Sequence, residues 1–403
     1  MLVQAAFRNV ARNPRRTITT MIAVALGVWS LLFLAAFNTG ALERLREVTI
    51  HARHGHGQVA RRGYFDEVYE KPHEHWIDKG ADVEAKLRAI PGVAATFPRV
   101  SFPALLTNGH VSIGALGQGV DAAKEAGFFN ALNIEDGVPL TDQSEGVVLG
   151  KGLAASLGVK PGDVVTVLGQ TVNGTTNSTE LVVAGIFHVG SPDFDDRVFR
   201  MQIKEAQSFL DTDQVESIAV ALADDRDAAW APFAAAVSAA MPELGAKSFA
   251  QLDEVNYVHM RDWLLSQAGV FEAIIAMLVF FGVVNTVAAA VLDRRQEIGT
   301  LRANGESRGE VLALFALEAS VAAAAGVIAG VALHLVVAHV LLAKGILLPP
   351  PSGMTRPLLV FLHTEAKVVA RVSVTAIAIT VVGAGIASVR AVRTPIAEAL
   401  RAV

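Results

Sequence analysis

Several groups of residues in this sequence have the types that do chemistry, and the histidines are the most concentrated. Five of the 11 histidines fall between residues 51 and 75, namely His51, His54, His56, His73 and His75. Zinc and copper accept imidazole ligands, and acidic residues lie nearby. The spacing does not form a closed tetrahedral set, however, and polar histidine-rich segments are also ordinary surface loops. We therefore predict no metal site.

Two short motifs resemble catalytic loops, and neither has the context that its chemistry needs. Residues 146–153, GVVLGKGL, share glycines and a lysine with phosphate-binding loops. The glycine spacing is one residue short and no Ser or Thr follows the lysine, so a tight turn before a helix fits better. Residues 305–309 match G-x-S-x-G, whose serine is a nucleophile only in a strand–turn–helix setting. We interpret Ser307 and Glu310 as a capping box, and we predict no catalytic residue.

The composition places part of the chain in lipid. Of its 403 residues 52% are hydrophobic, and the mean hydropathy is +0.43, above the range typical of globular domains. The net charge is -5, so the chain lacks the positive excess that binding nucleic acid requires. Because there is no cysteine, disulfides and thiolate sites are excluded.

Four stretches are long and apolar enough to cross a bilayer. A helix needs about 20 apolar residues to span a hydrocarbon core of roughly 30 Å. The predicted transmembrane helices are 17–37, 270–292, 311–342 and 368–389. Buried helices of a soluble domain are the alternative, but such helices rarely stay uncharged over these lengths. The first stretch could also be a signal peptide; it is longer than a typical signal, so we expect it to be retained.

The arginines predict which ends of these helices face the cytoplasm, because Lys and Arg are held on that side during insertion. They are concentrated in three segments, 1–16, 293–310 and 390–403. If the spans alternate, all three segments lie on one side, so both termini are predicted to be cytoplasmic. Residues 38–268 then form a large extracytoplasmic domain, and 343–367 form an extracytoplasmic loop.

The extracytoplasmic domain has the pattern of an α+β fold made of two subdomains. The first set of predicted elements is a helix at 82–90 and strands at 93–97, 101–106 and 111–117. The second set is strands at 147–149, 164–168 and 181–187, separated by turn-forming residues. A strand at 217–221 and a helix at 226–240 follow. This order predicts an inserted subdomain over about residues 121–215.

A few ionisable residues lie within or at the ends of the predicted spans, namely Glu272, Glu318, His334, His339 and Arg371. Such residues are costly in lipid and often mark proton or ion paths. No closely spaced acidic relay is visible among them, and most lie where they can face other helices or reach the interface. A proton-driven pump therefore stays open only as an alternative.

The segment 293–310, between the second and third spans, has the pattern of a short amphipathic helix. Helical spacing puts Ile298 and Leu301 on one face, with charged residues around them, and Gly305 ends the helix. A helix lying on the lipid surface is one interpretation of this pattern.

This segment, DRRQEIGTLRANGESRGEV, resembles the E-R-x-x-E-I-G-x-L-R-A-x-G-x-S-x-x-x-V motif of permeases in the MacB, LolC/LolE and FtsX superfamily of ABC transporters. The resemblance extends to AFRNVARNPRRT, similar to the amphipathic helix that opens these permeases, to GVVLGKGLAASLGVKPGDVVTV in the exterior domain, and to the C-terminal TPIAEALR. Asn304 and Glu306 depart from the usual residues of the motif.

The resemblance implies a permease of the bacterial inner membrane that is not itself an enzyme. Its implied partners are a separate ABC ATPase, which binds ATP and Mg²⁺, a second permease, membrane lipid, and a lipoprotein or amphiphile as substrate. No cofactor is expected on this chain. The residues implied to dock the ATPase are Arg294, Glu297, Ile298, Gly299, Leu301, Arg302 and Gly305. An FtsX-like regulator that relays the ATPase state to an exterior partner is the alternative.

Apolar side chains near the outer halves of the first two spans predict where a substrate would enter. These residues are Phe33, Phe37, Phe271, Ile274 and Leu278, and within each span they are three or four positions apart, so each set lies along one helical face. Such a face ordinarily packs against lipid or another helix. The sharper hypothesis is a lateral cleft between two permeases that admits acyl chains.

Overall fold

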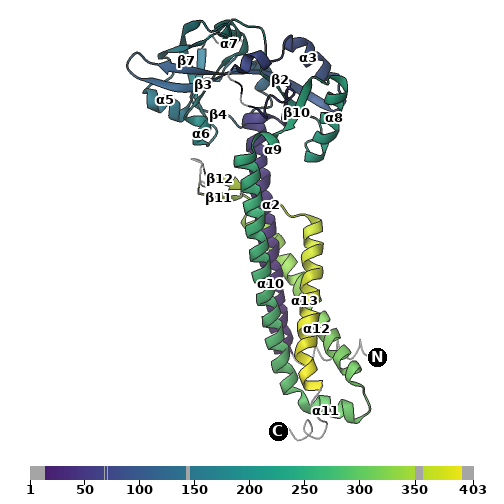
Figure 1. Ribbon diagram of the computed structural model, residues 1–403. Helices are drawn as coiled ribbons and strands as arrows, with labels where there is room; N and C mark the ends of the chain where they lie inside the picture. Colours follow the sequence, from purple (N-terminus) through teal and green to yellow (C-terminus); the bar gives the residue numbers. More distant parts are fainter. Residues whose placement is uncertain (1–13, 68, 70, 142–145, 350–356, 393–403) are drawn as a thin grey trace. The chain divides into compact units, whose positions relative to one another are not determined.

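The computed structural model describes residues 14–67, 69, 71–141, 146–349 and 357–392 (Figure 1). Two compact units make up the chain, and one of them consists of Glu43–Met260 with Leu348–Leu358. The other unit holds the long apolar helices. Most of the predicted N-terminal amphipathic helix, 1–16, and most of the predicted tail, 390–403, lie outside the described residues.

Four helices of the described chain are long and apolar enough to cross a membrane, as the sequence predicted. They are α2 (Pro14–Thr49), α10 (His259–Asp293), α12 (Arg308–Val336) and α13 (Ala366–Val392). The short helix α11 (Arg295–Ala303) connects α10 to α12, and a π-helical turn, η5 (Val337–Leu341), follows α12. The strands β11 (Ile346–Leu348) and β12 (Leu358–Val360) pair ahead of α13.

The helical unit has an apolar core in which α2 and α12 approach closely. The core includes Val24, Val28, Leu32, Val283, Phe315 and Val327. The approach depends on two glycines of α12, spaced four residues apart. A Cβ at Gly326 would lie 2.9 Å from the carbonyl oxygen of Met21, and one at Gly330 would lie 2.6 Å from that of Ala25. Small residues at this spacing let membrane helices pack backbone to backbone.

Two helices extend beyond the predicted spans. Helix α2 does not end at Phe37 but continues to Thr49, and the π-helical turn η1 (Ile50–His54) carries it on to Gly55, whose φ is +69°. Helix α10 likewise begins at His259, well before residue 270. The added residues of α2 favour a helix although they are polar, as in the pair Arg44–Glu47 at 2.9 Å. The hydropathy pattern identified only the apolar part of α2 and α10, and each helix is longer than its predicted span.

The β-rich unit is built on a ten-stranded sheet whose order is β10-β1-β9-β2-β3-β8-β5-β7-β4, with β6 paired to β2 and β7. The strands are β1 (Gly57–Arg61), β2 (Val93–Thr107), β3 (Ser112–Val120), β4 (Asn133–Gly137), β5 (Gly146–Gly150), β6 (Val164–Gln170), β7 (Thr176–His188), β8 (Val198–Gln202), β9 (Ser217–Leu222) and β10 (Leu244–Ser248). The helices are α3 (Gly80–Arg88), α4 (Ala122–Glu125), α5 (Lys151–Leu157), α6 (Pro192–Asp195), α7 (Ile203–Leu210), α8 (Trp230–Ala240) and α9 (Phe249–Leu252), with short turns η2 (Pro72–His75), η3 (Asp227–Ala229) and η4 (Glu254–Val258).

Six of these strands close into a barrel, because β6 joins β2 to β7 and completes the ring β2-β3-β8-β5-β7-β6.

The β-rich unit combines strands and helices, so its α+β fold is as predicted. The strands predicted at 93–97 and 101–106 are wrong in one respect, since they form the single strand β2. Its first half pairs with β9 and its second half with β3 and β6, so both halves are held in one line. The boundary of the inserted subdomain at about 121–215 stays a prediction.

Candidate functional site

The short helix α11 is set off from its neighbours by local backbone signals. Arg294 has φ -106° and ψ 20°, which separates α10 from α11, and Gly305 has φ +100°, a conformation that favours glycine. Helix α12 then begins with the predicted capping box: Glu310 N–H donates to Ser307 Oγ at 3.2 Å, and Ser307 N–H donates to Glu310 Oε2 at 2.7 Å. Ser307 thus has a structural role.

Arg294 fastens α11 to α12. Its Nε donates to Glu297 Oε2 of α11 at 2.5 Å, and its Nη1 donates to Glu318 Oε2 of α12 at 2.9 Å. Its guanidinium also lies 5.5 Å from the centre of the Phe315 ring. One side chain therefore holds both helices by charge-assisted hydrogen bonds, which are stronger than neutral ones.

The Arg294–Glu318 pair is buried, with 12% and 10% of the two side chains exposed. Burial opposes the charge on Arg294, but the hydrogen bonds and negative charges of Glu297 and Glu318 outweigh it and raise the pKa of Arg294 above its ordinary value. Removing Glu318 would leave the buried charge of Arg294 paired with Glu297 alone, and removing Arg294 would take its buried ion pair from Glu318, so either change is costly.

The two sides of α11 differ in exposure, and this changes the docking prediction. Ile298 is 2% exposed and packs in the helical core beside Val311 and Phe315. Gly299 is buried as well, and Leu301 is half-buried against the same core. The predicted apolar face therefore packs inside the chain, and Ile298 has no surface left for an ATPase. The amphipathic pattern was right, but it marked an intramolecular contact.

The opposite side of α11 is exposed and mostly polar. Gln296, Glu297 and Thr300 are exposed, followed by the residues 303–305, while Arg302 is half-buried. Of the residues predicted to dock an ATPase, Glu297 and Gly305 are thus exposed, and Arg294 is held by its ion pairs with Glu297 and Glu318. The exposed side of α11 is therefore its polar side.

The predicted cleft residues lie on outward-facing parts of their helices. Phe271, Ile274 and Leu278 are 44%, 47% and 67% exposed, and Phe33 and Phe37 are half-buried. The ring of Phe33 lies 5.9 Å from that of Trp29. None of the five residues lines the pocket that the structure has between α2, α10 and α13.

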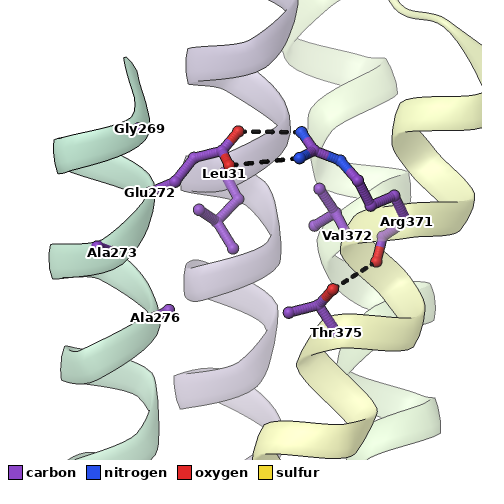
Figure 2. Close-up of a pocket in the computed structure, with 8 residues that line it drawn as sticks. All are labelled: Leu31, Gly269, Glu272, Ala273, Ala276, Arg371, Val372 and Thr375. Atoms are coloured by element: carbon purple, nitrogen blue, oxygen red, sulfur yellow. Dashed lines mark hydrogen bonds and ion pairs between the residues drawn. The ribbon is translucent and has the colours of Figure 1, made fainter. Parts of the chain in front are cut away.

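That pocket contains an ion pair that the sequence prediction missed. Arg371 Nη2 of α13 donates to Glu272 Oε1 of α10 at 3.0 Å (Figure 2). Both residues were recognised as charges within the spans, but separately. Their opposite signs, and their similar distances from the arginine-rich ends, are the signals in the sequence that would have paired them.

In the β-rich unit, buried charges hold the end of the α2–η1 helix. Arg99 of β2 donates to the carbonyl oxygen of Arg53, and Arg200 of β8 donates to that of Ala52 at 3.3 Å. Glu125 joins the two arginines, at 2.8 Å from Arg99 Nε and 3.3 Å from Arg200 Nη1. Burial lowers the pKa of Arg200 to about 10, against the effect of Glu125 and with that of Arg99. Arginines from two strands thereby bind the carbonyl oxygens at the end of this helix.

The family model described as "MacB-like periplasmic core domain" matches residues 17–239, and the model described as "FtsX-like permease C-terminal" matches residues 269–396. The first match alone covers more than half of the chain. The chain belongs to the family of ABC transporter permeases that carry a MacB-like periplasmic core domain. The resemblance noted in the sequence is therefore confirmed.

Two sequence relatives of this permease agree with the family match. It is 25% identical over 352 residues to the lipoprotein-releasing system transmembrane protein LolC of Neisseria meningitidis, covering 80% of this chain and 78% of the relative. It is 26% identical to the corresponding LolE of Haemophilus influenzae, covering 79% and 76%. The periplasmic region of MacB from Actinobacillus actinomycetemcomitans is 14% identical with a TM-score of 0.36, covering 49% of this chain and 90% of that one.

Several other residues that the sequence marked as candidates for chemistry contact structural partners in this permease. His56 Nε2 lies 2.7 Å from Asp225 Oδ1, His51 Nδ1 lies 2.9 Å from the carbonyl oxygen of Phe128, and the ring of His75 stacks on Tyr69. No group of three or more metal-binding side chains converges within the described residues. In the loop-like motif, β5 leads directly into α5, and Lys151 pairs with Glu135 at 2.6 Å.

Proposed function

We propose that this permease is the membrane subunit of a transporter that acts on a lipoprotein or another amphiphile at the outer leaflet of the bacterial inner membrane. ATP would be hydrolysed, with Mg²⁺, by a separate ATPase subunit. The observation that carries the proposal is the difference between the two sides of α11. One side packs on the helical core through Ile298 and the Arg294–Glu318 pair, and the other side is exposed. A helix of this kind can take up motion from a partner and pass it to α12.

The motion of the ATPase would reach α12 through Arg294. A nucleotide can favour only those conformations for which its protein has different affinities, so α11 must occupy different positions in the two states. The buried pair makes α11 and α12 move together, because separating the charges is costly. Within the β-rich unit, Arg99 and Arg200 hold the end of the α2–η1 helix, so a displacement of that end moves β2 and β8 with it.

The proposed arrangement has both termini in the cytoplasm and two permeases per transporter, either identical or different. The names of the LolC and LolE relatives, which are lipoprotein-releasing proteins, support a lipid-anchored substrate. The exposed Phe271, Ile274 and Leu278, with Phe33 and Phe37, remain our proposed lining of a lateral cleft between the two copies. ATP would supply the work of extraction, because an acyl chain gains little free energy on leaving lipid for an apolar cleft.

Photo-crosslinking from α11 tests the ATPase part of the proposal. A photoreactive residue at the exposed Thr300 should cross-link an ATP-hydrolysing chain in native membranes, whereas one at Ile328, which is 70% exposed on α12, should cross-link lipid. Ile328 is a suitable control because it is also exposed but lies within a predicted span. Equal capture of an ATPase from both positions, or from neither, would contradict docking on α11.

Crosslinkers at Phe33 and Phe271 test the substrate. They should capture a lipoprotein or amphiphile in the nucleotide-free state and lose it when ATP is trapped. Bulk phospholipid alone, unchanged by nucleotide, would argue against the cleft. Capture of an exterior partner protein from the β-rich unit, with no substrate in the cleft, would favour the FtsX-like regulator instead.

A further inference from the structure

A pocket of about 350 Å³ lies within the helical unit. Figure 2 shows how three helices form it, with Leu31 from α2, Gly269, Glu272, Ala273 and Ala276 from α10, and Arg371, Val372 and Thr375 from α13. Most of these side chains are small or apolar. Glu272 and Arg371 are the two charged residues among them, and they point toward one another.

The ion pair remains accessible from outside the helices. Arg371 donates from Nη2 to Glu272 Oε1 at 3.0 Å and from Nη1 to Oε2 at 3.5 Å, yet 59% of its side chain and 33% of that of Glu272 are exposed. A guanidinium has more N–H donors than this pair occupies, and a carboxylate can accept further bonds. Both groups can therefore bind a second ligand without breaking their contact.

The depth of the pair in a membrane follows from the helix rise. Arg371 precedes Arg390 by 19 residues and Glu272 precedes Arg294 by 22. At about 1.5 Å per residue, both charges lie roughly 30 Å from the arginine-rich ends of their helices, which is about the thickness of the hydrocarbon core. The pair is thus placed where the headgroups of the opposite leaflet begin.

The rest of the pocket continues toward the hydrocarbon. Ala276 and Thr375 lie one helical turn deeper than Glu272 and Arg371, respectively, and Leu31 and Val372 add apolar wall. The hydroxyl of Thr375 donates to the carbonyl oxygen of Arg371 at 2.8 Å, so its polar atom is already bonded. The pocket consequently has a charged mouth at headgroup level and an apolar floor at the level of acyl chains.

We propose that this pocket binds one phospholipid that has a primary amine in its headgroup. The lipid phosphate accepts hydrogen bonds from Arg371, its ammonium donates to Glu272, and the upper part of an acyl chain lies against Ala273, Ala276 and Val372. The carboxylate of Glu272 selects against anionic lipids, because their phosphate has no neighbouring positive charge to offset the repulsion. The proposed orientation of the chain assigns this lipid to the outer leaflet.

The site differs from the proposed substrate cleft, whose α10 residues are not among those that line the pocket. The two proposals can therefore fail independently. If no lipid binds in the pocket, cross-linking of an ATPase from Thr300 still tests the proposed function. If the topology is the reverse of the predicted one, only the leaflet from which the lipid comes would change.

Native mass spectrometry of the full-length chain tests the site after purification from vesicles of phosphatidylethanolamine and phosphatidylglycerol in equal amounts. The wild-type chain should retain one phosphatidylethanolamine. Arg371→Gln should reduce this retention about tenfold, and so should Ala276→Leu, which fills the pocket and leaves both charges in place. The neighbouring Met277→Leu is the matched control, because Met277 is 59% exposed and does not line the pocket; its retention should be unchanged.

Three results would overturn the proposal. Equal retention of phosphatidylglycerol, or retention that survives both Arg371→Gln and Ala276→Leu, would leave Glu272–Arg371 as a contact between helices only. Stabilisation of the lipid-free protein in detergent by millimolar inorganic phosphate, lost in Arg371→Gln, would assign the site to a free phosphate group. The lipid proposal expects no such stabilisation. Thermal unfolding of each variant in the same detergent checks that it is folded. If Arg371→Gln does not fold, Ala276→Leu still tests the pocket, because it keeps both charges.

Discussion

Nη1 of Arg294 lies 2.9 Å from Oε2 of Glu318, and about a tenth of each side chain is exposed. Arg294 precedes α11 and Glu318 belongs to α12, so the pair joins the two helices on either side of the turn at Gly305. Because it is buried, the pair tolerates little relative motion, and α11 is positioned by it as well as by Ile298.

Glu318→Gln should therefore weaken both stability and coupling. It leaves the charge of Arg294 buried without its main partner on α12, a change that costs about 3–5 kcal/mol when an ion pair is well buried. The midpoint of thermal unfolding in detergent should fall, and the ATPase that copurifies with the permease should no longer respond to substrate.

Glu297→Gln is the control for this prediction, since it removes the other partner of Arg294 at a side chain that is 60% exposed. Exposed pairs contribute about 0–1 kcal/mol, so the unfolding midpoint should change little. Equal effects of the two substitutions would mean that burial of Glu318 has no energetic consequence.

The contact of α12 with α2 gives a second prediction. A methyl group at Gly330 would come within 2.9 Å of Val28 Cβ and 2.6 Å of the Ala25 carbonyl oxygen, so Gly330→Ala must separate the helices. We expect it to destabilise the bundle by about 1–3 kcal/mol, the usual cost of overpacking. Gly282→Ala in α10 meets no atom within 4 Å and should be neutral or stabilising, since Ala has the higher helix propensity by up to about 1 kcal/mol. Thermal unfolding of both variants in one detergent compares them.

The hydrophobic lengths predicted the four membrane helices because lipid imposes one requirement, a long and mostly apolar helix. The same pattern did not mark the end of α2, since residues after Phe37 are polar and helical at once, and polarity was taken as the end of the helix. Nor did short-range patterns show that β2 is one strand, because its pairing with β9, β3 and β6 involves residues far away in the sequence.

The docking site on α11 stays a prediction, and the structure adds which of its residues are exposed. The motif located α11, and amphipathicity identified Ile298 and Leu301 as one face. Periodicity cannot distinguish a face that packs on the chain's own core from one that binds a partner, because both are apolar. The pairs Arg294–Glu318 and Glu272–Arg371 join different helices, so they required the three-dimensional arrangement.

Cysteine labelling tests the predicted topology, and the chain has no cysteine of its own to interfere. Asn304→Cys and Ser178→Cys both create thiols at exposed positions. In intact cells with a permeabilised outer membrane, an impermeant maleimide should label Ser178→Cys and not Asn304→Cys. After lysis both should react at similar rates. Labelling of Asn304→Cys alone in intact cells would show that the orientation is the reverse of the predicted one.

The environment of His56 specifies its protonation state. The backbone N–H of Leu222 donates to His56 Nδ1 at 3.2 Å, so that nitrogen carries no proton, and Nε2 lies 2.7 Å from Asp225 Oδ1, to which it donates. Burial lowers the pKa of His56; Asp225 raises it, while Arg46 and His51 lower it, and the net direction is downward. Protonation of the folded state would break the bond from Leu222.

Acid should therefore destabilise the β1–β9 region through His56. In the unfolded chain the imidazole titrates near its ordinary pKa of about 6.5, whereas the folded chain resists protonation, so the unfolded state binds more protons as the pH falls below that value. The stabilising contribution is complete above about pH 6.5 and is lost progressively below it. Hydrogen exchange of the Leu222 amide in the full-length protein, corrected for the intrinsic rate, should show protection that declines from pH 7 to pH 5. His56→Gln should flatten that decline, and His110→Gln, at an exposed turn, should not. A decline that is the same in all three proteins would exclude His56 as its source.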